Sequence, residues 1–177
     1  MSNIIIMWSM FLIPWLTLIF MKKEDIKRYM PVGLLAIVTT TIIYDVGTTL
    51  GFWTLRESFF PFNYMEPYFY GTIPVLTMWV FKFTEGRFWT YMLTNIILDI
   101  GFNFFLLNYF FPSRGIMDFN IPPLFSLPIT LTHAAVLYGY QIWQNDMLFK
   151  SENNIAHIQP AAAKPLNNLQ DKEKDNY

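Results

Sequence analysis

The stretch from Thr94 to Asn103 reads Thr-Asn-Ile-Ile-Leu-Asp-Ile-Gly-Phe-Asn, an apolar run with one acidic residue, Asp99, near its middle. Apolar residues of this kind are what a membrane-spanning helix requires, and a carboxylate there costs about 2.5–3.5 kcal/mol on insertion scales. Such a group normally faces a bundle interior or a watery cavity. Asn95, Asp99 and Asn103 are spaced four apart, so they share one helix face. The stretch therefore predicts a polar seam inside a membrane helix bundle.

Composition and charge agree with this class of protein. Of the 177 residues 54% are hydrophobic and 19% aromatic, whereas only 14% are charged. The net charge of −1 argues against a nucleic-acid binder. The chain contains no cysteine, which excludes disulfides, thiolate catalysis and Cys-ligated metals. We expect the lipid bilayer to be the main partner.

Five apolar segments approach the length of about 20 residues that crosses a bilayer. The sequence thus predicts an all-α, polytopic integral membrane bundle over residues 1–143, with spans at about 3–21, 30–54, 67–83, 88–111 and 122–143. The first segment is expected to be a retained helix and not a cleaved signal peptide, because its positive charges follow the apolar run. Residues 144–177 are polar and predict a disordered cytoplasmic tail.

The lysines and arginines predict the orientation. Ten of the twelve lie after span one, after span three or in the tail, and the other two are Arg56 and Arg114. Cytoplasmic loops carry the excess of basic residues in membrane proteins. We therefore expect a multi-pass protein of the cell membrane with its N-terminus outside and its C-terminus in the cytoplasm.

A short internal similarity links spans two and four. At an offset of 54 residues, five positions of the segment 40–47 are identical to those of the segment 94–101, including Asp45 with Asp99, and Pro74 aligns with Pro128. This is consistent with a parallel two-helix repeat that relates spans two and three to spans four and five. Chance and shared helix composition are the alternative explanation.

The candidate site consists of polar residues inside the predicted spans. They are Asp99, Asp45, His133, Asn95, Asn103 and Thr41. Two nearby carboxyls can share a proton, and with an imidazole they form a relay for a proton, a cation or a small solute. The alternative is a non-transporting structural or regulatory protein, in which the same side chains hydrogen-bond across helix interfaces. Bonds of that kind average about 0.6 kcal/mol but fix helix packing.

The sequence does not indicate an enzyme, a cofactor or a metal site. Two aspartates on different spans give a superficial similarity to intramembrane aspartyl proteases, but those enzymes carry Gly-x-Gly-Asp where this chain has Ile97-Leu98-Asp99. Closely spaced metal ligands such as H-x-x-x-H do not occur. Neither a P-loop nor G-x-G-x-x-G is present, so nucleotide chemistry is not indicated.

The spanning part resembles the uncharacterised small five-helix membrane proteins of spore-forming Gram-positive bacteria. The resemblance rests on the basic first loop, the Asp-Val-Gly run at Asp45, the aromatic loop after span two and the Asp-Ile-Gly run at Asp99. It implies the five-helix fold and no particular activity. Because five helices enclose little volume, a transporter of this size is expected to need a homo-oligomer or a partner membrane subunit.

Overall fold

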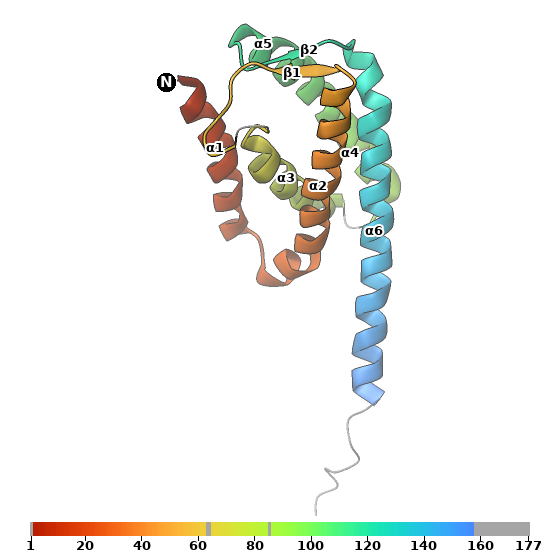
Figure 1. The fold of residues 1–177 in the computed structure, drawn as a ribbon. Helices are drawn as coiled ribbons and strands as arrows, with labels where there is room; N and C mark the ends of the chain where they lie inside the picture. Colours follow the sequence, from red (N-terminus) through yellow and green to blue (C-terminus); the bar gives the residue numbers. More distant parts are fainter. Residues whose placement is uncertain (1, 63–64, 85, 158–177) are drawn as a thin grey trace, which may run out of the picture. The chain divides into compact units, whose positions relative to one another are not determined.

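The computed structural model describes residues 2–62, 65–84 and 86–157. The chain divides into two compact units, Met1–Trp143 and Gln144–Tyr177. The helices, coloured along the chain in Figure 1, are α1 (Ser2–Thr17), the short 3₁₀ helix η1 (Leu18–Phe20), α2 (Lys23–Thr49), α3 (Tyr68–Thr84), α4 (Phe88–Gly101), the π-helix η2 (Phe102–Phe110), α5 (Phe111–Ser113) and α6 (Pro123–His157). The strands are β1 (Trp53–Leu55) and β2 (Met117–Phe119).

Three helical segments of the described chain are long and apolar enough to cross a membrane. They are Asn3–Phe20, Lys23–Thr49 and Phe88–Ser113. The last one runs without a break through α4, η2 and α5. The expected membrane character of the fold is therefore confirmed at the level of these three segments.

The outer surface of α2 is apolar in a regular pattern. Leu34, Val38, Ile42 and Val46 follow one another at intervals of four residues and are 50–58% exposed. Residues four apart lie on one face of a helix, so these side chains form a continuous stripe. A soluble monomer rarely exposes a large contiguous apolar surface, and a stripe of this kind fits contact with lipid.

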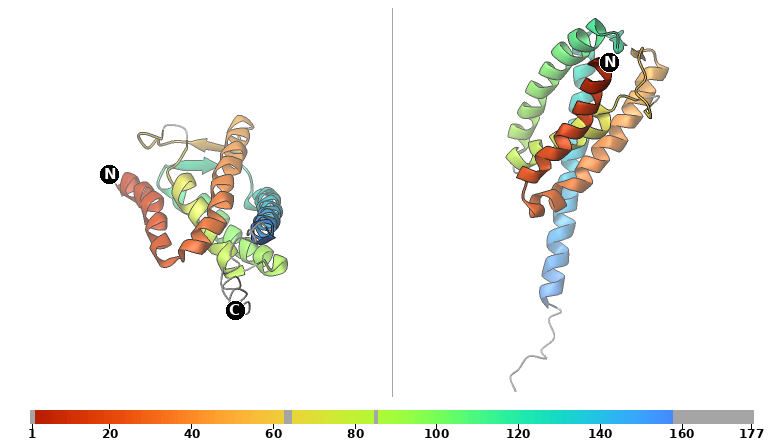
Figure 2. Two further views of the ribbon diagram at one scale, coloured as in Figure 1. Left: turned by 90° about the horizontal axis from the view of Figure 1, so that it is seen from below. Right: turned by 90° about the vertical axis from the view of Figure 1, so that its left-hand side faces the viewer.

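Helix α3 lies between α1 and α2 and packs against both, as Figure 2 shows. Its contact with α1 is a backbone contact, because a Cβ atom built on Gly71 would collide with backbone atoms of Phe11 and Met10. Two side chains strengthen the contact: Thr72 Oγ1 donates to the Met10 carbonyl at 2.8 Å, and Trp15 Nε1 donates to the Tyr70 carbonyl at 3.0 Å. Small residues permit this close approach of helices in membranes.

The two strands form a cap at one end of the α1–α6 arrangement, visible at the top of Figure 1. They pair antiparallel, with Trp53 opposite Phe119 and Leu55 opposite Met117. Alternate side chains of a strand point to opposite faces, so the apolar residues lie on the inner face and Thr54 and Asp118 on the outer one. We call β1 and β2 together the strand cap.

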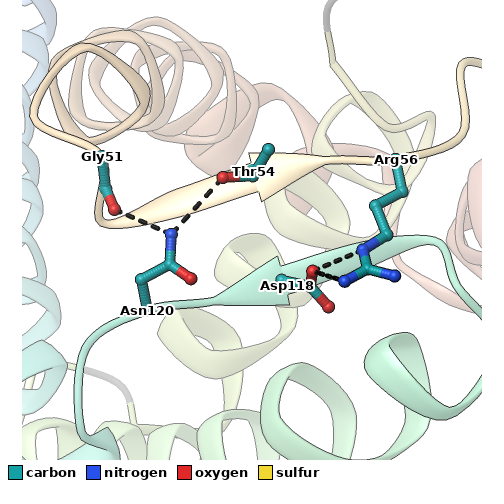
Figure 3. A network of polar contacts seen from close by, with 5 residues as sticks. All are labelled: Gly51, Thr54, Arg56, Asp118 and Asn120. Atoms are coloured by element: carbon teal, nitrogen blue, oxygen red, sulfur yellow. Dashed lines mark hydrogen bonds and ion pairs between the residues drawn. The ribbon is translucent and has the colours of Figure 1, made fainter.

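Polar contacts tie the strands together on the outer face of the cap. Asn120 Nδ2 donates to the Gly51 carbonyl at 2.9 Å, and Arg56 forms an ion pair with Asp118 (Figure 3). On the inner face Trp53 Nε1 donates to the Tyr44 carbonyl at 3.1 Å. A Cβ on Gly47 would overlap the Trp53 ring, so this glycine provides the space that the indole occupies.

Three helix ends differ from the sequence-based expectation. Helix α2 already begins at Lys23, so the basic segment forms its first turns, and it ends at Thr49 instead of continuing to Thr54. Gly51 then adopts a positive φ of 75°, a conformation common after helix ends. Helix α6 continues to His157, because a helix that has already formed propagates at little cost per added residue. The rest of the expected tail, residues 158–177, lies outside the described residues.

The two segments of the 54-residue similarity have different surroundings. Gly47 packs against Trp53, whereas a Cβ on Gly101 would meet no atom within 4 Å. Pro74 is buried in α3, and Pro128 is exposed on α6. The repeat therefore remains a prediction from sequence alone.

The glycine contact between α1 and α3 gives a stability prediction. Gly71→Ala is expected to lower the free energy of unfolding by about 1–3 kcal/mol, because the added methyl group meets helix backbone that cannot move aside cheaply. The control is Gly139→Ala in α6, where the added Cβ has open space. That change is expected to be neutral or to stabilise by about 0.5–1 kcal/mol through helix propensity. Thermal unfolding in detergent measures both, and equal midpoints would contradict the proposed close contact.

Candidate functional site

A cavity of about 490 Å³ lies between α2, α3, the α4–η2 segment and α6, with the strand cap contributing to its wall. This volume is in the range of pockets that hold small molecules. All lining residues belong to the first compact unit. The predicted polar seam is therefore expected to line this cavity.

Two helices contribute most of the polar lining. Asn95, Asp99 and Asn103 line it from the α4–η2 segment, and Ser126, Thr130 and His133 line it from α6. Positions three or four apart share a helix face, which explains why each set points the same way. Four of the six sequence-predicted site residues, Asn95, Asp99, Asn103 and His133, are therefore brought together here.

Most of these polar groups already have partners within the protein. Asn103 is 1% exposed, and its Oδ1 accepts a hydrogen bond of 2.7 Å from Ser126 Oγ. His133 Nε2 lies 2.7 Å from Thr39 Oγ1 on α2. Asn95 Nδ2 donates to the Tyr91 carbonyl at 2.9 Å, one turn earlier. The first two of these bonds join α6 to η2 and to α2, whereas the third lies within α4.

Asp99 differs from its neighbours. Its Oδ2 is buried and makes no hydrogen bond with any described residue. Thr130 is the polar side chain that faces the carboxyl from α6. Unpaired buried polar atoms are uncommon and call for an explanation such as a ligand or a functional role. The hydroxyls of Thr40 and Tyr44, which also line the cavity, are likewise buried without a well-formed hydrogen bond to a described residue.

The remaining walls are apolar and aromatic. Trp53, Met117 and Phe119 of the strand cap line one end of the cavity. Leu76, Ile97 and Phe105 line it as well, yet they are 38%, 62% and 60% exposed. The cavity is therefore bordered by side chains that belong to the apolar outer surface of the bundle.

Asp45 and Thr41 are not among the residues that line the cavity. Asp45 is exposed, and because α2 ends at Thr49 it lies in the last turn of the helix and not near mid-span. Thr41 Oγ1 donates to the Ile37 carbonyl of its own helix at 2.8 Å. The structure therefore does not bring Asp45 together with Asp99, since Tyr44 and not Asp45 points into the cavity from this part of α2.

Glu66 is a buried acidic residue that sequence reasoning missed. It lies just before α3, is 0% exposed, and neither carboxylate oxygen hydrogen-bonds to a described residue. Burial raises the pKa of its carboxyl from an ordinary 4.5 to about 7. The available signal was its position in the run Met65–Phe69, where one charge stands among apolar and aromatic residues.

Comparisons with protein-family models, with curated proteins and with solved structures find no match to this chain. Within the described ranges, no group of three or more histidine, aspartate or glutamate side chains is arranged to hold a metal ion. The chemistry of the cavity then follows from its own residues.

The bond between Ser126 and Asn103 gives a second prediction. Ser126→Ala is expected to destabilise the protein by about 1–3 kcal/mol, because it leaves the buried amide oxygen of Asn103 without its donor. Thr132→Ala is the matched control, since that exposed hydroxyl bonds only to the Pro128 carbonyl of its own helix. Its effect should stay within about 0.5 kcal/mol. Chemical or thermal unfolding of both variants provides the comparison, and indistinguishable stabilities would argue against the interhelical bond.

Proposed function

We propose that the chain is a multi-pass protein of the cell membrane with five spanning segments, and that it binds a small, positively charged solute in the cavity beside Asp99. The fourth and fifth segments are α3 and the first part of α6, which pack with the three long apolar helices or border the same cavity. The N-terminus and the strand cap are assigned to the outside, and the start of α2, with its basic residues, to the cytoplasmic side.

The observation that carries the proposal is the unpaired carboxylate oxygen of Asp99 in an otherwise apolar and amide-lined cavity. An intramembrane carboxylate normally pairs with a basic group or faces water. The basic side chain among the described lining residues is His133, which is engaged with Thr39. A positively charged ligand would supply the missing counter-charge, and aromatic rings such as those of Trp53 and Tyr68 also attract cations.

The apolar border of the cavity supports entry from the membrane. A solute with an apolar body partitions into lipid, and the exposed Ile97 and Phe105 side chains would lie in contact with acyl chains. An amphipathic amine satisfies both requirements, with its ammonium group at Asp99 and its apolar part against the aromatic walls. Transport of such a solute, or of a proton in exchange, is an extension of this binding role.

The cavity also bears on the expected need for a partner subunit. A single chain provides a cavity of about 490 Å³, although five helices were expected to enclose little volume. Binding therefore does not require a second copy, and an oligomer remains a separate proposal.

A structural role is the second candidate function. The Asn103–Ser126 and Thr39–His133 bonds join different helices and would fix their packing without any ligand. This explanation covers those four residues well. It does not explain why Asp99 keeps an unpaired carboxylate oxygen.

A ligand-binding experiment distinguishes the binding of a cationic solute from a purely structural role. The purified protein in lipid nanodiscs is expected to bind 2-phenylethylamine more tightly than the neutral 2-phenylethanol of similar shape. Asp99→Asn should weaken amine binding at least about tenfold, because a hydrogen bond to a charged group contributes about 1.5–3 kcal/mol. Binding of the alcohol should be nearly unchanged. Equilibrium dialysis with labelled compounds measures all four affinities.

The matched control for that experiment is Asp45→Asn, which removes the exposed carboxylate of the sequence repeat. Its affinity for the amine should equal that of the parent. If Asp99→Asn folds normally and binds the amine as the parent does, Asp99 is a packing residue and the structural role is the better one.

The absence of cysteine makes the topology directly testable. Single substitutions Ser58→Cys and Ser113→Cys, at exposed positions next to the strand cap, should react with a membrane-impermeant maleimide on intact cells. Glu24→Cys, exposed in the first turn of α2, should react only after the cells are opened. The reverse labelling pattern would overturn the orientation, and labelling of all three in intact cells would show that the chain does not span the membrane as proposed.

A further inference from the structure

Glu66 is the buried ionisable group that the proposed binding site does not use. Its side chain is inaccessible, and it does not line the cavity. The residues around it in sequence, Met65, Pro67 and Tyr68, are buried as well. Neither carboxylate oxygen makes a well-formed hydrogen bond to another described residue, and the polar group that acts on the carboxyl is the backbone N–H of Glu66 itself. A carboxyl buried in such surroundings is more stable with its proton bound than ionised.

The titratable groups that face Glu66 are two tyrosines. The carboxyl acts electrostatically on the hydroxyl of Tyr44, from α2, and on that of Tyr68, from α3. The hydrophobic cluster that contains both tyrosines also draws side chains from α1, α3, the strand cap, η2, α5 and the connecting loops. Of the nearby arginines, Arg56 pairs with Asp118 and Arg114 lies over the Phe110 ring. Neither acts on Glu66 as a counter-charge.

An ionised carboxylate in this position would therefore be buried without a partner. Burying an isolated charge is so costly that the group usually neutralises instead. Burial raises the pKa of the Glu66 carboxyl to about 7, which agrees with the cost of burying its charge. The closed arrangement of the structure is thus one in which Glu66 carries its proton.

Glu66 is connected to the cavity through the two tyrosines. Both Tyr44 and Tyr68 line the cavity. The Tyr44 ring stacks on Trp53 at 6.0 Å between centroids and meets Phe69 edge-on at 5.0 Å. Trp53 in turn belongs to the strand cap. A change of charge at Glu66 therefore acts on the side chains that hold the cap against the helices.

We propose that Glu66 is a proton-binding site that controls the strand cap: with the proton bound the cap is closed over the cavity, and release of the proton to the outer solution draws water to the carboxylate and loosens the cap. The site is distinct from Asp99 and does not depend on the solute proposed for the cavity. No bond other than the carboxyl O–H breaks, and the proton passes to water.

Cysteine labelling of the cap tests the proposal. Met117 is 1% exposed on the inner side of the cap, so Met117→Cys reports opening, and the exposed Ser113→Cys corrects for the reactivity of the thiol at each pH. The ratio of their maleimide labelling rates in nanodiscs should rise roughly tenfold between about pH 6 and pH 8, as the ionised fraction of a group titrating near 7 does. In a Glu66→Gln background the ratio should stay at its low-pH value. A pH-independent ratio in the parent, or an unchanged pH dependence after Glu66→Gln, would overturn the proposal.

A second measurement applies even if Glu66→Gln does not fold. Infrared spectra of the parent should contain a protonated-carboxyl band that disappears with a midpoint near pH 7. The band should persist in Asp99→Asn and in Glu57→Gln, the latter a loop carboxyl that accepts a hydrogen bond from Asn3 at 2.6 Å. Loss of the band in Asp99→Asn would assign the proton to Asp99 and refute the Glu66 site. Absence of any such band in the parent would refute it as well.

The pH dependence of thermal stability is an independent test of the proton bound to Glu66. The folded state holds the proton of Glu66 up to about pH 7, whereas the unfolded chain releases it near the ordinary value of 4.5. The unfolded state therefore binds fewer protons in this window, and stability falls as pH rises through it. The unfolding midpoint of the parent should decline between about pH 5 and pH 7.5 more steeply than that of Glu66→Gln. A parent that becomes more stable over this range, relative to the variant, would contradict a bound proton.

Discussion

The contact between the Trp53 indole and Gly47 determines how the strand-cap end of this bundle is built. The ring fills the space where a larger residue on α2 would have a side chain, and its N–H is satisfied by the Tyr44 carbonyl. This fixes β1, and β2 follows through its pairing with β1. Because Trp53 and Tyr44 both line the cavity, the same contact shapes the cavity wall.

Helix positions were largely predictable from sequence, because apolar runs of membrane length leave the chain little choice but to satisfy its backbone within a helix. The ends of the helices were harder to predict than their positions. Span two was extended to Thr54, although Gly51 already indicated a stop before it, and this placed Asp45 too deep. The strand cap was not foreseen, because its two strands are three residues each and pair across more than sixty positions of sequence. No local pattern specifies such a pairing.

The candidate site was predictable where helical spacing determined it. Asn95, Asp99 and Asn103 share a face, and that face does border the cavity. Helical spacing alone could not show which of these side chains bond to another helix and which one keeps an unpaired oxygen. Asn103 and His133 are bonded to other helices, whereas Asp99 keeps an unpaired oxygen, and this difference depends on side chains from α2 and α6. The burial of Glu66 could not be predicted from sequence, because it results from the loop returning toward the bundle before α3.

The π-helix η2 has a consequence for how related chains can vary in length. Its hydrogen bonds connect residues five apart, as the bond from Asn108 Nδ2 to the Asn103 carbonyl also does at 2.8 Å. Such wide turns accommodate an additional residue within an otherwise regular helix. Deleting one residue between Phe102 and Phe110 would restore α-helical geometry while leaving Asp99 in place. It would also rotate Phe111 and the following loop about the helix axis. Insertions and deletions at this site would therefore alter the end of the bundle next to the strand cap, and with it the position of Asn103, while leaving Asn95 and Asp99 in α4 unchanged.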